Sequence, residues 1–322
     1  MKTPLINIQS LYKQFESKKG KLKILDNISF SIYQGETVGL VGESGCGKST
    51  LGKLILRLHD PSAGKIFYKG ENIFSFSSKT MKRYRQKVQM IFQDPFASLN
   101  PRMTAEEIIR EPLDIHKNMK RKLRKERVKE LLALVGIHPL SSNRYPHEFS
   151  GGQRQRIGIA RALSLHPEFI VCDEPLAALD VSIGAQIVNL LKDLQYKFQL
   201  TYLFISHDLA MVKYISDRVI VMYLGQIMEM AETKILYKNP SHPYTQALLS
   251  TISIPDPQKE AKRTPIVLKG EIPSPLNPPK GCVFCTRCPK AQKICFEKAP
   301  KETEIAPNHI VKCHFFDKPP TT

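Results

Sequence analysis

A glycine-rich stretch at residues 42–50 constrains the fold more than any other feature of the chain. It reads Gly-Glu-Ser-Gly-Cys-Gly-Lys-Ser-Thr and directly follows an apolar, strand-like segment at 37–41. Apolar residues with helical spacing begin directly after it, over 51–58. Such a strand, loop and helix form a βα unit, in which glycines let backbone N–H groups turn onto an anion at the helix N-terminus. We therefore predict an α/β fold with a mainly parallel sheet.

The loop matches the P-loop pattern Gly-x4-Gly-Lys-Ser and ends in Lys48 and Ser49. We expect Lys48 to reach the β- and γ-phosphates of a nucleotide and the Ser49 hydroxyl to ligate Mg²⁺. An ordinary glycine-rich turn is the alternative, and the placement between strand and helix argues against it. The predicted phosphate-binding residues are Gly42, Glu43, Ser44, Gly45, Cys46, Gly47, Lys48, Ser49 and Thr50.

Two adjacent carboxylates, Asp173 and Glu174, end a later apolar segment at 169–172. An apolar run before Asp-Glu is weak evidence alone, but downstream of a P-loop it indicates a Mg²⁺ site. We expect Asp173 to hold the metal, and Glu174 to orient and deprotonate the attacking water.

A second anion site is predicted at Ser150-Gly-Gly-Gln153, which precedes a helical pattern. Ser150 is a good N-cap, and the two glycines expose backbone N–H groups at the start of the helix. A plain capped helix is the alternative, and the order of the motifs along the chain favours the anion site.

Together these motifs resemble the ATP-binding cassette (ABC) ATPase family over at least residues 5–250. The resemblance assigns Gln93 to the Q-loop, Asp180 to the D-loop, and His207 to the histidine that contacts the γ-phosphate. Phe15 takes the position of an aromatic ring that stacks on adenine, with Tyr12 as the alternative. The signature motif is Ser150, Gly151, Gly152 and Gln153, preceded by Phe149 where Leu is commoner.

The same resemblance implies a mechanism. Lys48, Glu174 and His207 would be catalytic, and Ser49, Gln93 and Asp173 would surround the Mg²⁺. Two cassettes would bind head to tail, with ATP between the P-loop of one and the signature motif of the other. Because the chain holds one cassette, it would have to dimerise. We expect this cassette over residues 1–250, with a helical subdomain at about 95–165.

Three longer stretches, at 89–102, 145–156 and 239–249, resemble the oligopeptide/dipeptide importer ATPases, and Gln153-Arg154 resembles the F-type subunit. This resemblance implies a D-like ATPase partner, two transmembrane permeases and an extracytoplasmic peptide-binding protein. The chain would then be peripheral, at the cytoplasmic face of the inner membrane. Nickel importers share much of the pattern, so nickel is an alternative substrate.

The last part of the chain differs in composition. Of the 23 prolines, 12 follow residue 250, and 254–262 has the composition of a linker, so we predict a small, loop-rich C-terminal domain at 251–322. Five of the seven cysteines lie there, and all-thiolate ligation suits zinc or an iron–sulfur cluster. Spacing alone favours Cys282, Cys285 and Cys288. The importer resemblance instead implies a 4Fe–4S cluster on Cys282, Cys288, Cys295 and Cys313, with zinc or unliganded thiols as alternatives.

The net charge of +18 favours anionic partners such as nucleotides, nucleic acid or a membrane surface. The segment 117–129 holds eight Lys or Arg and predicts a basic amphipathic helix with Leu123, Val128, Leu131 and Leu132 on one face. A nucleic-acid ATPase is an alternative function, but no second cassette, coiled-coil arm or inserted zinc module is recognisable. No apolar run of about 18 residues predicts a transmembrane helix, and no secretory signal is evident. Intact Glu174 and His207 argue against a non-catalytic regulatory subunit.

Overall fold

The central sheet is built from the apolar segments of the chain. The computed structural model describes residues 3–17, 20–116, 119–252 and 265–316. The larger sheet has the order β11-β12-β10-β9-β3-β8-β7-β6, and it is parallel from β9 to β6. Its parallel strands are β9 (Arg218–Tyr223), β3 (Thr37–Val41), β8 (Thr201–Ile205), β7 (Phe169–Asp173) and β6 (Val88–Ile91). This core agrees with the predicted α/β class.

A second, antiparallel sheet, which the sequence analysis did not predict, has the order β2-β1-β4-β5. Its strands are β1 (Ile6–Ser17), β2 (Gly20–Ile32), β4 (Ala63–Tyr68) and β5 (Glu71–Asn72). Leu51, Leu54 and Ile55 of α1 (Lys48–Ile55) are buried in one apolar cluster with side chains from both sheets. Because α1 is packed from both sides, the glycine loop that precedes it has a fixed position.

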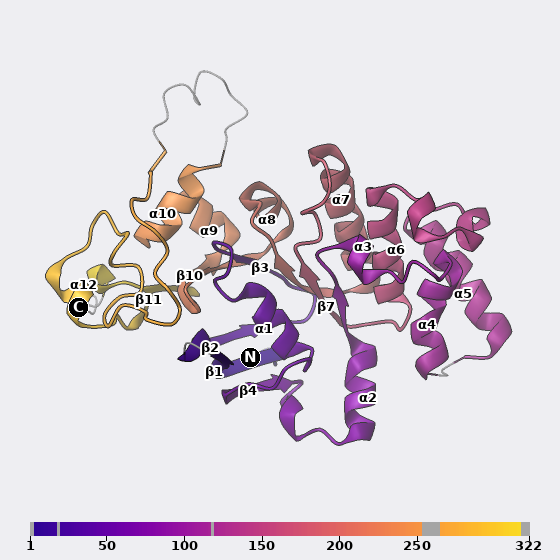
Figure 1. The fold of residues 1–322 in the computed structure, drawn as a ribbon, viewed down its shortest axis with the longest axis horizontal. Coiled ribbons are helices and arrows are strands. Elements are labelled where there is room, and N and C mark those ends of the chain that lie inside the picture. The colour runs from indigo at the N-terminus through magenta and orange to yellow at the C-terminus, as the bar shows by residue number, and fades with distance from the viewer. Residues whose placement is uncertain (1–2, 18–19, 117–118, 253–264, 317–322) are drawn as a thin grey trace.

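Helices α3 to α6 form a group at one end of the molecule (Figure 1). They are α3 (Pro95–Ser98), α4 (Ala105–His116), α5 (Arg121–Leu134) and α6 (Gly151–Leu163), within the range predicted for a helical subdomain. In α5, Val128, Leu131 and Leu132 are buried as predicted, but Leu123 is half exposed. The start of the predicted basic helix, at 117–118, lies outside the described residues.

The other helices lie between strands along the chain, and all but the first of them connect strands of the larger sheet. They are α2 (Ser78–Lys87), α7 (Val181–Phe198), α8 (Leu209–Ile215), α9 (Thr233–Lys238) and α10 (Pro243–Ser250). Within the described parts of the chain, no helix is long and apolar enough to cross a membrane.

The C-terminal segment, residues 265–316, continues the sheet of the cassette. Its elements are α12 (Lys293–Glu297), β11 (Glu302–Ala306) and β12 (His309–Lys312), and β12 pairs antiparallel with β10 (Gln226–Glu232). Phe284 lies in the same buried cluster as Tyr223 and Tyr244. The sheet and the core therefore cross the boundary predicted at residue 250. The predicted linker at 254–262 lies outside the described residues.

A buried carboxylate links the C-terminal segment to the cassette. Glu229 of β10 is fully buried, and its Oε1 lies 2.8 Å from Nε2 of His309 on β12. The same carboxylate accepts the backbone N–H groups of Ser241 and His242, at 2.8 and 2.9 Å. The stretch 239–249 therefore contacts the Glu229 carboxylate, which joins the cassette to the C-terminal segment. Removing one member of such a buried pair leaves an uncompensated charge.

We expect His242 to make the fold sensitive to acid. It caps α10 by accepting the Tyr244 N–H, and burial lowers its pKa to about 4. Because the unfolded chain takes up this proton near pH 6.5, stability falls as the pH drops through the window between the two values. The loss between pH 7 and pH 5 is about 2 kcal/mol. Urea unfolding at both pH values measures it.

The variant His242→Asn keeps a cap acceptor but cannot be protonated in this range. Between pH 7 and pH 5 we expect its free energy of unfolding to fall by about 2 kcal/mol less than that of the wild type. His138→Asn is the matched control, because His138 caps a short helix in the same way but is exposed. Equal pH dependence in the wild type and His242→Asn would contradict the role of His242.

Candidate active site

The glycine loop takes backbone conformations that other residues avoid. Gly45 and Gly47 have φ values of 79° and 105°. A Cβ atom on Gly47 would lie 2.8 Å from the carbonyl oxygen of Ile24, so a larger residue would displace the neighbouring strand. Gly47 is the N-cap of α1 and offers no side-chain cap. The first N–H groups of α1 can therefore bind an anion.

A cavity of about 310 Å³ lies against this loop. Lys48 lines it and is buried, and its Nζ donates hydrogen bonds to the carbonyl oxygens of Gly42 (2.7 Å) and Glu43 (3.0 Å). The lining consists of Ile24, Ser44, Gly45, Gly47, Lys48, Ser49, Thr50, Gln93 and Glu174. Most of the predicted phosphate-binding residues are therefore at one cavity, while Gly42, Glu43 and Cys46 contribute to the loop behind it.

Ser49 and Asp173 are in contact, as a shared Mg²⁺ site requires. The Ser49 hydroxyl donates to Oδ1 of Asp173 at 2.8 Å. Burial raises the pKa of the Asp173 carboxyl, and the charge of Glu174 raises it further. A bound cation relieves both effects, so these oxygen ligands fit Mg²⁺.

Glu174 is held between two polar side chains. Gln93 Nε2 donates to its Oε2 at 2.9 Å, and Nδ1 of His207 lies 3.6 Å from the same oxygen. Glu174 has a φ of 43°, and its N–H donates to the carbonyl of Ile205 at the end of β8. A non-glycine residue in this region is strained, and such strain often marks a functional site. The structure thus brings together Gln93, Glu174 and His207 from three separate loops.

The signature residues lie elsewhere. Ser150 caps α6 and forms a reciprocal pair with Gln153, since each side chain accepts the other's backbone N–H. A Cβ on Gly152 would lie 2.6 Å from Cγ2 of Ile183, so α7 packs directly against this glycine. Asp180 caps α7 through the N–H of Ile183. The signature residues do not line the cavity at the P-loop, and both Ser150 and Gln153 are exposed.

The aromatic residue predicted to stack on adenine, Phe15, does not line the cavity. Phe15 contacts the ring of His59 edge to face, with ring centroids 5.8 Å apart. From the β1–β2 hairpin, it is Ile24 that lines the cavity. Sequence reasoning missed Ile24, because its placement depends on the irregular pairing of β1 with β2. The adenine contact of Phe15 stays a prediction.

The cysteine cluster does not have the predicted metal-site arrangement. Among the described residues, no group of three or more His, Cys, Asp and Glu side chains could hold a metal ion. Cys282, Cys285, Cys295 and Cys313 are buried, and burial raises the pKa of the Cys282 thiol to about 12. Buried cysteines pack as small apolar groups. The prediction of a 4Fe–4S cluster or zinc is therefore not supported.

Known proteins are similar to both parts of the chain. Residues 25–177 match the ABC transporter family, and residues 228–295 match the oligopeptide/dipeptide transporter C-terminal region. The oligopeptide transport ATP-binding protein AppF of Bacillus subtilis is 58% identical over 303 residues, which cover 94% of this chain and 92% of AppF. OppF of Haemophilus influenzae, also an oligopeptide transport ATP-binding protein, is 52% identical over 300 residues, which cover 93% of this chain and 90% of OppF.

A solved structure supports the fold. The dimeric structure of MJ0796, a bacterial ABC transporter cassette, aligns with a TM-score of 0.65 and 29% identity. The alignment covers 71% of this chain and 98% of the cassette. The chain therefore belongs to the ABC transporter family of ATP-binding proteins, in the group that carries the oligopeptide/dipeptide transporter C-terminal region.

Proposed function

We propose that this chain hydrolyses ATP to power the import of peptides through an ABC transporter. The observation that carries the proposal is Glu174, whose carboxylate lies between Gln93 and His207 at the cavity of the P-loop. A carboxylate in this place can accept a proton from water that attacks the γ-phosphate. The peptide substrate is supported by the similarity to AppF and OppF, which are oligopeptide transport ATP-binding proteins.

A complete site needs a second cassette. The P-loop and the exposed signature residue Ser150 do not share a cavity within one chain. In a head-to-tail dimer the N-terminus of α6 from the partner would approach the γ-phosphate opposite α1, and both helix ends favour an anion. ATP would then join the two cassettes more strongly than ADP. The partner in this proposal is a D-like ATPase subunit.

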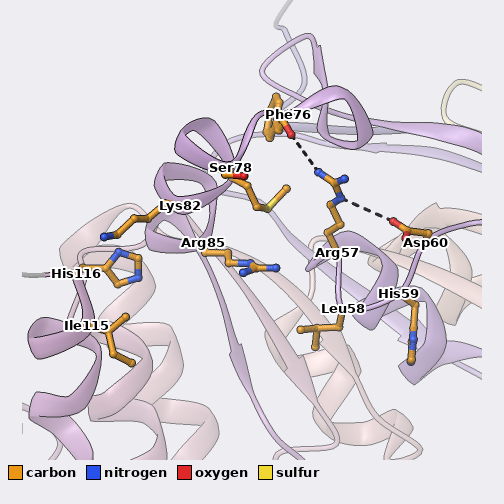
Figure 2. A pocket seen from close by; sticks show the side chains of 11 residues that line it. Arg57, Leu58, His59, Asp60, Phe76, Ser78, Lys82, Arg85, Ile115 and His116 are labelled. Carbon is orange, nitrogen blue, oxygen red and sulfur yellow. Dashed lines mark hydrogen bonds and ion pairs between the residues drawn. The ribbon is translucent and has the colours of Figure 1, made fainter.

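A second cavity, of about 590 Å³, suits a permease segment. It is lined by Arg57, Leu58, His59, Asp60, Phe76, Ser78, Met81, Lys82, Arg85, Ile115 and His116 (Figure 2). Lys82 and Arg85 are exposed cations, while Leu58 and Ile115 leave more than half of their side chains exposed to solvent. A short segment with acidic residues and an apolar face would match this lining.

The same cavity is coupled to the catalytic carboxylate through the chain. Gln86 Nε2 lies 2.8 Å from Nδ1 of His116, which joins α2 to the end of α4. Strand β6 follows α2 directly and leads to Gln93, which contacts Glu174. A permease segment between α2 and α4 could therefore act on the position of Gln93. Two permeases and an extracytoplasmic binding protein would complete the importer, at the cytoplasmic face of the membrane.

We expect Arg85→Glu to reduce recovery of permeases with the tagged protein from membranes by at least about tenfold, because the charge would repel an acidic segment. Uptake of a labelled oligopeptide by cells that depend on this protein would fall equally. The ATPase activity of its dimer with the D-like partner, measured without permeases, should remain. Arg83→Glu is the matched control, since Arg83 is exposed on the same helix but does not line the cavity.

Several outcomes would contradict the proposal. Normal permease recovery with Arg85→Glu would exclude this cavity as the docking site. Uptake of nickel but not of peptide by the wild type would show that the imported substrate is nickel. Recovery of nucleic acid without permeases would favour the nucleic-acid ATPase.

A further inference from the structure

The C-terminal segment contacts the P-loop through a buried ion pair. Arg287 Nη1 lies 2.6 Å from Oε2 of Glu43, the second residue of the P-loop. The two side chains are only 10% and 23% exposed, respectively, so water screens their charges weakly. Glu43 is predicted to bind phosphate as part of the P-loop, and its carboxylate is directed to the C-terminal segment.

Both backbone groups of Glu43 are also held. Its N–H donates to the hydroxyl of Tyr244 at 3.0 Å, and its carbonyl accepts Nζ of Lys48 at 3.0 Å. One residue of the loop therefore contacts α10, the lysine of the ATP site and, through Arg287, the C-terminal segment. A shift of Glu43 would be passed directly to Lys48.

Arg287 is itself fixed by aromatic packing. Phe284, three residues earlier, packs against the rings of Tyr223 and Tyr244, with centroids 5.2 and 5.3 Å apart. Nη1 of Arg287 lies 3.4 Å from the Tyr223 hydroxyl. A separate cavity of about 260 Å³ is lined by Glu43 and by residues 272–275 of the segment, and it shares Ser44 and Gly45 with the ATP cavity.

We propose that Arg287 is a positioning residue of the ATP site, through which the C-terminal segment sets the affinity for ATP. It fixes Glu43, and it neutralises a carboxylate that would otherwise repel the triphosphate. Without Arg287, the loop would carry an uncompensated negative charge next to the phosphates. The inference depends on the ATP binding of the proposed function, and it does not depend on the imported substrate.

The test is a double-mutant cycle on the full chain, with KM for ATP, kcat and the equilibrium Kd for ATP as readouts. We expect Arg287→Gln to raise both KM and Kd about tenfold and to change kcat by less than about twofold. Arg287→Lys should recover most of the affinity. The variant Glu43→Gln removes the carboxylate and should have a smaller effect. The double variant Arg287→Gln/Glu43→Gln should bind ATP better than Arg287→Gln alone.

This rescue separates a charge effect from loss of fold, because removing the Glu43 carboxylate relieves an uncompensated charge but does not restore lost packing. Lys293→Ala is the control, since Lys293 lies in the same segment on α12 and is 93% exposed. Wild-type affinity in Arg287→Gln, or a double variant no better than Arg287→Gln, would overturn the inference. A wild-type protein that does not bind ATP would instead overturn the proposed function.

Discussion

Glu174→Gln should lower the ATPase rate by at least about 10²-fold while ATP still binds. The amide has nearly the same shape and can still accept the hydrogen bond that Gln93 donates to Oε2. It cannot take a proton from the attacking water, so the variant removes the chemical step and leaves the site assembled. Because ATP then stays between the two cassettes, we expect an ATP-bound dimer to accumulate.

Two measurements check this result together. Steady-state phosphate release gives the turnover, and size-exclusion chromatography with and without ATP gives the fraction of dimer. Glu126→Gln is the control, because Glu126 is exposed on α5 away from the cavity. Normal turnover in Glu174→Gln would show that Glu174 is not the base. Lost turnover without ATP binding would mean that the variant damages the site.

The parts of the site that the sequence predicts are those formed by neighbours in the chain. The conformation of Gly47 and the cap made by Ser150 depend on a few consecutive residues, and both are found where the motifs place them. Asp173 and Glu174 belong to this class as well, because the end of a buried parallel strand is a local feature. The pairing of Ser49 with Asp173 comes from the motif order of the family and from the adjacent positions of α1 and β7.

The features that the sequence did not predict depend on contacts between distant residues. Ile24 lines the cavity because of irregular register between two strands. The C-terminal segment was expected as a separate domain on the basis of its prolines, yet β12 extends the sheet of the cassette. Cysteine spacing predicted a metal site, but among the described residues no group of His, Cys, Asp and Glu side chains could hold a metal ion, and Cys282 and Cys295 lie in the apolar core. The amino-acid composition does not determine which strands pair or which cavity a side chain lines.

Lys48→Ala should abolish ATP binding at working concentrations, with KM raised by about 10²-fold or more. Lys48 Nζ is buried in the loop and donates to the carbonyl oxygens of Gly42 and Glu43, so it is positioned at the phosphate site before ATP arrives. Alanine removes the only positive charge among the residues that line the cavity. Isothermal titration with an ATP analogue gives the affinity, and Lys65→Ala, on the exposed face of β4, is the control.

Glu174→Gln and Lys48→Ala affect different steps of ATP use, so combining them gives a further check. Glu174→Gln acts after ATP has bound, whereas Lys48→Ala acts before. The double variant Lys48→Ala/Glu174→Gln should therefore remain monomeric with ATP, as Lys48→Ala does alone. A double variant that still forms the ATP-dependent dimer would show that Lys48 contributes to hydrolysis but not to binding. In that case the backbone N–H groups at the start of α1 would bind the phosphates, because no side chain caps the N-terminus of this helix.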